Sequence, residues 1–342
     1  MGAGGQRGLA LRTCQSIDHD MAASNKVVLS RLLTVLCLPV TAPLLLAYAL
    51  VVGVGTAALP KRARQKAHAA AIRVLTMGGP WGTCFDALTW HPWTAGVPSC
   101  IYAGVEPSDG KGLVVPVSKL CARAAGTLRL VVISDTHGKH HQLSTSLPEG
   151  DILVHSGDLL SRNASIGFNS GGAHWRALAA LRDFNEWLGA LPHAHKIVVA
   201  GNHDGVLESV GRERARALLS NAVYLEDEVC MVGGLRVGGS PWSATGGSAN
   251  RAFQSERPRL LQPDLRPSEP LDLLVMHFHH SEAAATLRPR VFASGHVHDA
   301  HGVWRAPWGL EVRASVCDGL YRAVQLPVVV DVPVRDPPGP FS

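Results

Sequence analysis

The segment VVISDTHG, residues 131–138, decides the fold of this chain. Two valines and Ile133 form an apolar, β-branched run that predicts the end of a buried strand. Gly138 then allows a sharp turn. Asp135 and His137 follow the strand directly, at the edge where open α/β sheets bind their ligands. Because polar pairs are common in turns, the meaning of this pair depends on what recurs downstream.

The same pattern occurs four more times, each time as an apolar run that ends in Asp, Asn or His. The segments are LVHSGD (153–158), IVVAGNHD (197–204), LLVMH (273–277) and VFASGHVH (291–298). From residue 128 onward, such runs alternate with helical patterns, which is typical of an α/β domain, and we place this domain at 128–332. The five polar ends predict a metal site along one edge of a sheet.

Two helices and a hairpin are expected between these strands. Residues 174–191 have amphipathic spacing, with Trp175 and Phe184 on the face predicted to pack in the core. Residues 207–220 predict a second helix. Residues 230–240 predict a hairpin that turns at Gly233 and Gly234.

Charge and cysteine usage narrow the class of protein. The net charge of +5 is uneven, because residues 1–127 carry +7 and residues 128–331 carry −2. A nucleic-acid binder carries its positive excess on the working domain, so no nucleic-acid partner is indicated. The 7 cysteines include no C-x-x-C pair, which argues against a zinc finger or a disulfide framework.

The N-terminal third differs in character. Residues 1–31 are expected to be mobile, and residues 32–60 contain no charged side chain. About 20 apolar residues suffice to span a bilayer, so 32–60 predicts a membrane-anchor helix, kinked at Pro39 and Pro43. A buried core helix and a cleaved signal peptide are the alternatives.

The sequence around this segment sets its expected orientation. A basic cluster at residues 61–66 favours the cytoplasmic side. We therefore expect a single-pass membrane protein with a cytoplasmic catalytic domain. Residues 61–127 are predicted to be a basic juxtamembrane and irregular extension, and residues 333–342 a Pro-rich tail.

The polar residues at the strand ends form a recognisable ligand set. They are Asp135, His137, Asp158, Asn202, His277, His296 and His298. Carboxylate, imidazole and amide donors without a thiolate suit Mn, Fe or Zn. Seven donors exceed the needs of one ion, so we expect two. Asp135, His137 and His298 would hold the first ion, Asn202, His277 and His296 the second, and Asp158 would bridge them. The remaining histidines of interest, His140, His141, His155 and His280, are predicted to be surface or packing residues.

This ligand set predicts phosphoester hydrolysis. Two divalent ions lower the pKa of a shared water and clamp a transferring phosphoryl group, so the expected nucleophile is a metal-bridging hydroxide. His203 is placed to protonate the leaving oxygen as general acid. Asp204 is expected to orient His203.

The order of the motifs resembles that of the calcineurin-like metallophosphoesterases. The details are similar to the metallophosphoesterase-domain-containing proteins, in the stretches ISDTH (133–137), DILVHSGD (151–158), FNEWL (184–188), KIVVAGNH (196–203) and ASVC (314–317). The resemblance implies a four-layer αββα sandwich. It also implies hydrolysis of phosphodiesters. The expected substrates are small-molecule phosphoesters, and cyclic nucleotides are among them.

One departure from the family pattern leaves alternatives open. After the lone histidine the family has Gly-Pro-Pro, whereas this chain has Phe278, His279 and His280. His279 is therefore an alternative ligand to His277. The stretch from His277 to Gly295 is also shorter than in those relatives, so the wall of the pocket is expected to differ. The other functions considered are a protein Ser/Thr phosphatase, a pyrophosphatase, and a weakly active binding or scaffold protein. The complete ligand set favours an enzyme, and the oligomeric state is left open.

Overall fold

The computed structural model describes residues 98–104, 112–161, 171–243, 252–255, 259–262, 266–319 and 321–334. The expected N-terminal segment 1–31, the expected anchor 32–60 and residues 335–342 of the expected tail lie outside these ranges. Within them, no helix combines the length and the apolar character that crossing a membrane requires.

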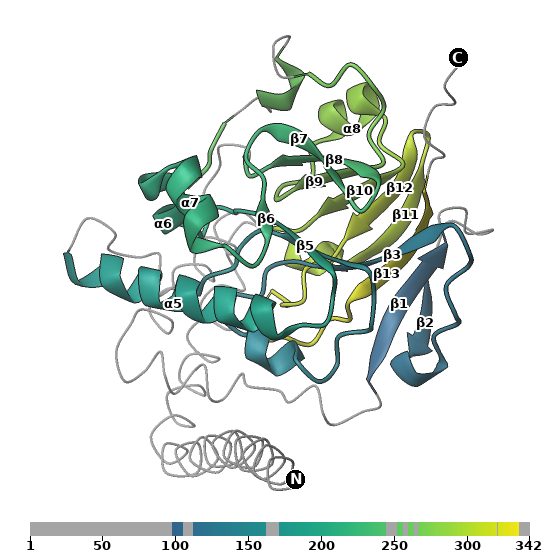
Figure 1. The fold of residues 1–342 in the computed structure, drawn as a ribbon, viewed down its shortest axis with the longest axis horizontal. Coiled ribbons are helices and arrows are strands. Elements are labelled where there is room, and N and C mark those ends of the chain that lie inside the picture. The colour runs from purple at the N-terminus through teal and green to yellow at the C-terminus, as the bar shows by residue number, and fades with distance from the viewer. Residues whose placement is uncertain are drawn as a thin grey trace, which may run out of the picture. The chain divides into compact units, whose positions relative to one another are not determined.

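The described strands form two sheets (Figure 1). The seven-stranded sheet runs β2 (Leu113–Pro116), β1 (Ser99–Gly104), β13 (Val328–Pro333), β3 (Thr127–Ile133), β4 (Ile152–Ser156), β5 (His195–Val199), β6 (Val223–Tyr224). The six-stranded sheet runs β11 (Gly302–Ala306), β12 (Gly309–Arg313), β10 (Val291–Ser294), β9 (Leu273–Met276), β8 (Leu235–Ser240), β7 (Glu228–Val232). In the seven-stranded sheet, the neighbouring strands β3, β4, β5 and β6 are parallel. In the six-stranded sheet, the neighbouring strands β8, β9, β10 and β12 are parallel. The carboxyl ends of these strands therefore share one edge in each sheet.

The two sheets pack face to face around an apolar core. Leu130 and Val132 of β3 belong to this core, together with Leu273 of β9 and Val291 of β10. Because side chains alternate along a strand, the intervening residues of β3 point to the other face, which is also buried. Burial on both faces explains why these strands are continuous apolar runs rather than alternating patterns.

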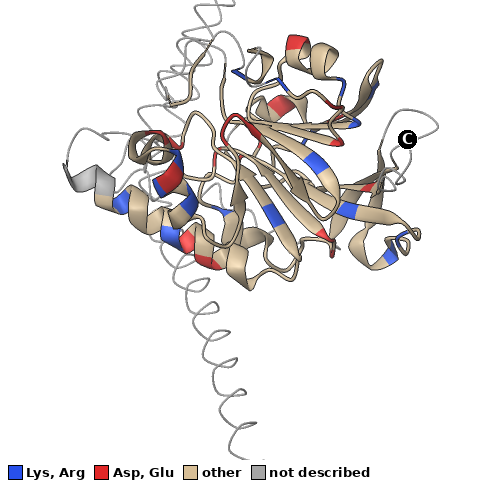
Figure 2. Ribbon diagram, turned by 45° about the horizontal axis from the view of Figure 1, so that its top comes forward, with Lys and Arg blue, Asp and Glu red and all other residues tan. Residues whose placement is uncertain are grey.

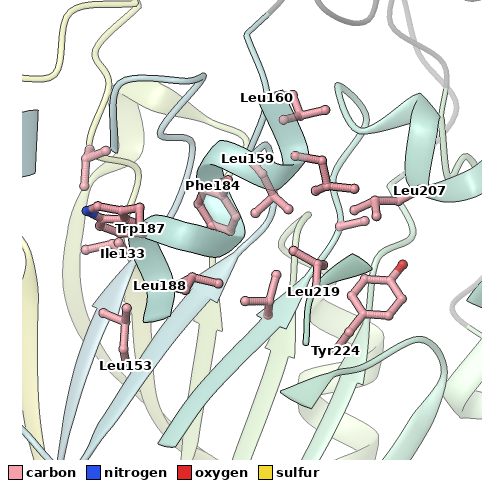
Figure 3. Packing of buried hydrophobic residues seen from close by; sticks show 14 of the residues in the cluster. Ile133, Leu153, Leu159, Leu160, Phe184, Trp187, Leu188, Leu207, Leu219 and Tyr224 are labelled. Atoms are coloured by element: carbon pink, nitrogen blue, oxygen red, sulfur yellow. The ribbon is translucent and has the colours of Figure 1, made fainter. Parts of the chain in front are cut away.

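Helices cover the outer face of the seven-stranded sheet. They are α5 (Gly171–Ala190), α6 (Gly205–Val210) and α7 (Arg212–Leu218). Figure 3 shows Phe184 and Leu188 of α5 lying over the strands that carry Ile133 and Leu153. All four side chains are buried, and each contributes about 1.5–3 kcal/mol relative to an exposed position.

The short helix α8 (Ser281–Leu287) and the 3-10 turn η4 (Arg259–Leu261) cover the outer face of the six-stranded sheet. Ala283 and Leu287 of α8 pack there against Leu274 and Phe292. The described residues therefore form a mixed α/β fold in the order helix, sheet, sheet, helix, which agrees with the αββα architecture that the resemblance implies. Basic and acidic residues are interspersed over its elements in Figure 2.

Two expectations about the helices were wrong in detail. The single helix expected at 207–220 is instead two helices, α6 and α7, separated by Gly211. The φ of 77° at Gly211 lies outside the helical region, so α6 ends before it and α7 begins after it. Trp175 was expected in the core but is 61% exposed. A helix of 20 residues is about 30 Å long, longer than the strands beneath it, so its first turns reach past the sheet. The hairpin of β7 and β8, with Gly233 and Gly234 at its turn, is as expected.

The expectation that residues 61–127 are irregular was wrong for part of the range. Strand β1 pairs in parallel with β13, from Ile101 with Val328 onward, and β2 extends the sheet beyond it. Arg129 of β3 holds Asp331 of β13 through two hydrogen bonds of 2.7 Å, and the Tyr102 hydroxyl of β1 donates to the same carboxylate at 3.1 Å. The boundary expected at residue 128 therefore falls inside the sheet.

This pairing predicts different stabilities for two fragments. A fragment of residues 128–342 should unfold at a temperature at least about 5 °C lower than a fragment of residues 98–342, because β13 loses its parallel neighbour and Asp331 loses Tyr102. Thermal unfolding followed by circular dichroism measures the difference. Equal midpoints would show that β1 and β2 are peripheral to the fold.

Candidate metal centre

The residues that the motifs single out lie at the carboxyl ends of five strands from both sheets. They are Asp135 and His137 after β3, Asp158 after β4, Asn202 and His203 after β5, His277 after β9, and His296 and His298 after β10. The structure brings all seven predicted ligands and the predicted acid together, in overlapping groups of donor atoms.

The first group consists of Asp135, His137 and His298. The Nε2 atoms of the two histidines are 3.1 Å apart, and His298 Nε2 is 3.3 Å from Asp135 Oδ1. Asp135 is fully buried, yet its pKa lies well below the usual range. Burial alone would raise this pKa, but the hydrogen bond and the charge of His298 together lower it by more than burial raises it. The carboxylate is therefore ionised and faces imidazole nitrogens.

The second group consists of Asn202, His277 and His296. Asn202 Oδ1 lies 3.0 Å from His277 Nε2 and 2.8 Å from His296 Nδ1, and these two nitrogens are 3.2 Å apart. Three potential ligand atoms thus form a nearly equilateral triangle.

Asp158 lies between the two groups. Its Oδ1 is 3.3 Å from His277 Nε2, while its Oδ2 is 3.8 Å from both His137 Nε2 and His203 Nε2. Burial alone would raise the pKa of Asp158, but the charge and the hydrogen bond of His277 hold it well below its usual range. One oxygen faces each group, which is the arrangement that a bridging carboxylate needs.

The spacing of these atoms fits divalent ions. Ligand atoms at about 2.1 Å from one ion lie about 3.0 Å from each other in octahedral geometry and about 3.4 Å in tetrahedral geometry. Five of the six separations within the two groups are 2.8–3.3 Å and match this spacing, and the sixth, between His137 Nε2 and Asp135 Oδ1, is 3.9 Å. The oxygen and nitrogen donor set also suits Mn, Fe or Zn, and the choice among these metals belongs to the proposal below.

Hydrogen bonds orient two of the histidines toward the centre. His277 Nδ1–H donates to the Ser156 carbonyl at 2.9 Å, and His298 Nδ1–H donates to the Asp318 carbonyl at 2.8 Å. Each bond turns the Nε2 atom inward. Partners of this kind fix the ring and the tautomer of metal-binding histidines.

His277, rather than His279, lies in the centre. His277 is fully buried, and nearby Asp158 raises its pKa to about 9 although burial acts in the opposite direction. His279 Nδ1 is instead 3.1 Å from Glu311 Oε1, and its ring packs against Phe292 in the outer core. The departure from Gly-Pro-Pro therefore leaves the strand-end histidine in place.

The backbone at the centre is held in an uncommon conformation. Positive φ angles occur at Asp135 (54°), His137 (46°), Asp158 (56°) and His296 (65°). Residues other than glycine rarely adopt this region, and it costs about 1–3 kcal/mol each where it occurs. Four such residues among eight indicate a site whose geometry is imposed by the surrounding fold.

Two glycines in the motifs make room for the carboxylates. A Cβ atom at Gly201 would lie 2.3 Å from Asp158 Oδ1, and one at Gly295 would lie 2.2 Å from Asp135 Oδ2. Real side chains do not approach this closely, so no other residue fits without displacing a carboxylate. This explains why Gly precedes Asn202 and His296 in the sequence.

His203 and Asp204 have separate tasks. His203 Nε2 faces Asp158 Oδ2, and the His203 ring contacts the His137 ring with centroids 4.7 Å apart. The Asp204 carboxylate accepts hydrogen bonds from the backbone N–H groups of Leu159, Leu160 and Gly201 at 3.2, 3.0 and 2.8 Å. It thereby joins the loops after β4 and β5. Burial, and secondarily Asp158, raise its pKa to about 7. These contacts show that Asp204 holds the two loops together, and its expected role in orienting His203 stays a prediction.

Sequence reasoning missed Tyr321. Its ring centroid lies 4.7 Å from that of His137 and 5.1 Å from that of His298. Tyr321 stands in the segment after β12, where no apolar run ends in a polar residue. The only available signal is its position four residues after ASVC, the last stretch shared with the family.

A further group of potential ligands, His140, His141 and Asp183, lies apart from the centre. The Nε2 atoms of His140 and His141 lie 3.1 and 3.0 Å from the two oxygens of Asp183. His140 is buried against Phe184 and Trp187, whereas His141 is exposed. The contacts connect the turn η3 (His140–Leu143) to α5, in agreement with a packing or surface role.

Comparison with known proteins is consistent with this geometry. The calcineurin-like phosphoesterase family matches residues 128–300. The UPF0046 protein C25E10.12 of Caenorhabditis elegans is 30% identical over 249 residues, which cover 62% of this chain and 83% of that protein. Metallophosphoesterase domain-containing protein 1 of Homo sapiens is 28% identical over 263 residues, which cover 65% of this chain and 76% of that protein.

The chain therefore belongs to the calcineurin-like phosphoesterase family, and its relatives include the metallophosphoesterase-domain-containing and UPF0046 proteins. The resemblance noted from the motifs is confirmed. Family and clustered donors together support a metal-dependent hydrolase of phosphoester bonds.

The centre predicts a pH-dependent response to metal. Without metal, His277 holds a proton below about pH 9, and this proton must leave before Nε2 can bind an ion. The stabilising His277–Asp158 pair is complete below the ordinary histidine pKa and is lost as the pH rises through about 9. The apparent dissociation constant for Mn(II) should therefore decrease up to about tenfold per pH unit between pH 7 and pH 9.

Thermal unfolding of EDTA-treated protein, with and without Mn(II), measures this effect. The rise in melting temperature on adding Mn(II) should grow from pH 7 to pH 8.5 and should be absent in Asp158→Asn. An Mn(II)-induced rise that is the same at every pH would contradict the role of His277.

Proposed function

We propose that this protein hydrolyses phosphodiesters, with cyclic nucleotides among its substrates, at a centre that holds two Mn, Fe or Zn ions. The observation that carries the proposal is the position of Asp158, which presents one oxygen to each of two groups of ligand atoms. Asp135, His137 and His298 would hold one ion, and Asn202, His277 and His296 would hold the other. When bound, the ions lower the pKa of a shared water and offset negative charge on the phosphoryl group.

His203 supplies the proton for the leaving oxygen. Its backbone N–H donates to Asp158 Oδ1 at 2.8 Å, which anchors the residue at the junction of the two groups. Burial lowers the pKa of His203, so the free imidazole is neutral at pH 7. An arriving phosphoryl anion raises the pKa of a neighbouring imidazole. Substrate binding therefore favours the protonated form of His203, which then acts as general acid.

Asp204 supports this arrangement from behind. Its three bonds to backbone amides join the loop that carries Asp158 to the loop that carries Asn202 and His203. The bridging carboxylate and the acid therefore keep a constant separation, which positions both relative to one phosphoryl group.

We also propose a single membrane span at residues 32–60, with the catalytic domain on the cytoplasmic side. The length of the uncharged segment and the basic cluster at 61–66 support it. A membrane-bound enzyme would act on substrates near the bilayer surface.

Replacement of His203 tests the catalytic proposal. His203→Ala should lower kcat for bis-p-nitrophenyl phosphate by about 10²–10⁴-fold, because the leaving oxygen loses its proton donor. The variant should still bind two metal ions per chain, measured by inductively coupled plasma mass spectrometry. His141→Ala, an exposed histidine outside the centre, is the matched control and should keep wild-type turnover.

The substrate preference is measured in the same assay. Turnover of the diester that exceeds turnover of p-nitrophenyl phosphate supports a phosphodiesterase. Preference for the monoester would indicate a phosphatase instead of a phosphodiesterase. Two bound metals without turnover of either ester would favour a binding or scaffold protein. Loss of metal in His203→Ala would make His203 a ligand instead of the acid.

Fractionation tests the membrane span. The full-length protein should sediment with membranes and stay there after extraction with sodium carbonate at high pH, whereas a variant lacking residues 32–60 should be released. Release of the full-length protein by carbonate would exclude a spanning segment.

A further inference from the structure

We infer that Tyr321 forms the wall of a subsite for a leaving group that carries a planar ring, such as a nucleoside or a phenol. The inference rests on the proposed function and adds the class of group that the centre selects. Tyr321 faces three histidines of the centre, with ring centroids 4.7 Å from His137, 5.1 Å from His298 and 6.1 Å from His203. It therefore lies beside the predicted acid and beside the first group of ligands.

The segment after β12 holds this ring in a costly conformation. Tyr321 has a φ of 60°, a region that bulky side chains seldom adopt. Its backbone N–H donates to the Asp318 carbonyl at 2.8 Å. Arg322 donates to the Asp318 carboxylate from its backbone N–H at 2.9 Å and from Nε at 2.7 Å. Strain that the surroundings maintain in this way is concentrated at functional sites.

The same carbonyl also orients a metal ligand. Asp318 O accepts the hydrogen bond of His298 Nδ1–H at 2.8 Å, and Gln325 Nε2 donates to the His298 carbonyl at 2.7 Å. The position of the Tyr321 ring is thus coupled to the position of His298. A loop that only connected two strands would need neither the positive φ nor this shared acceptor.

Exposure places the ring on the solvent side of the centre. The side chains of His137 and His203 are 2% and 4% exposed, whereas Tyr321, like His298, is partly exposed. The leaving group of a phosphoester must extend from the phosphoryl group past the acid toward solvent. Beyond His203 it meets the Tyr321 ring.

A tyrosine ring at this position favours a flat partner. Aromatic pairs with centroids about 4.5–7 Å apart gain more than their buried area alone provides, and a nucleobase or aryl ring stacks in the same way. Phe278 contacts the other group of ligands, with its centroid 5.2 Å from that of His296. Phe278 therefore lies on the side of the centre away from the acid. Tyr321 is the ring on the side of the acid, where the leaving group departs.

Binding of two phosphonates to the full-length, Mn(II)-loaded protein tests the inference. Phenylphosphonate and methylphosphonate share the phosphoryl group and differ in the planar ring, and neither is hydrolysed. Isothermal titration calorimetry should show that the wild type binds phenylphosphonate more tightly. Tyr321→Ala should weaken phenylphosphonate binding about 3- to 10-fold, the range expected for one ring contact, and leave methylphosphonate binding unchanged.

Two further variants make the result specific. Tyr321→Phe keeps the ring and should keep the preference for phenylphosphonate, and Trp175→Ala removes an exposed aromatic ring of α5 and should behave as the wild type. Metal content of Tyr321→Ala, measured on the same samples, should remain two ions per chain. In turnover assays, the same change should raise KM for bis-p-nitrophenyl phosphate more than it lowers kcat.

Each contrary result has its own meaning. Equal weakening of both phosphonates by Tyr321→Ala, or loss of metal, would show that the ring only supports the histidines and would overturn the subsite. An unchanged preference for phenylphosphonate would overturn it as well. Failure of the wild type to bind either phosphonate, with two metals present, would instead refute the proposed function together with this inference.

Discussion

Two ionised carboxylates that must remain buried dominate this structure. Asp135 is fully buried and Asp158 is 2% exposed. Burying an ion costs several kcal/mol unless hydrogen bonds and opposite charge offset it. The fold provides hydrogen bonds from the backbone N–H of His203 to Asp158 and from that of His296 to Asp135. The remaining compensation must be positive charge, which imidazolium protons supply in the metal-free protein, as the pKa of His277 near 9 indicates.

The same requirement explains the architecture around the centre. Each carboxylate needs donors from both sheets, so the ends of the two sheets must meet. An isolated parallel bridge between Ser134, after β3, and Ser315, after β12, joins them there. The glycines at 201 and 295 let neighbouring loops approach the carboxylates closely, and the positive φ angles turn the side chains of Asp135 and Asp158 inward. Metal-binding geometry is thus a property of two sheets packed together, not of one loop.

The recurring motifs made much of this predictable from sequence. An apolar run that ends in a polar residue indicates both a strand and the edge at which the strand ends, so the ordered set predicted the sheets and the proximity of the seven residues. The ligand roles themselves remain predictions. Features without such a pattern were missed. Strands β1 and β2 join the sheet through backbone pairing with β13, which has no local signal, and the exposure of Trp175 depends on how far α5 extends beyond the sheet.

Asp204 makes contacts that sequence proximity does not predict. It follows His203 directly, which suggested that it orients that ring, yet its three carboxylate bonds reach backbone amides of two different loops. The β4 loop that supplies two of them is more than 40 residues away in sequence. Long-range contacts of this kind follow from the packing of the strands and have no counterpart in local spacing.

Tyr321 extends this argument from the centre to substrate choice. The predicted metal ligands stand at strand ends, where alternating strands and helices make them recur in a readable order. The residue that faces the leaving group comes from the segment between β12 and β13, where nothing recurs, and its position depends on the Asp318 carbonyl and a strained φ angle. The chemistry of the centre is therefore encoded in a pattern that recurs along the sequence. The choice of leaving group is encoded in one loop, and there a change of a single ring can alter specificity while the metal ligands stay the same.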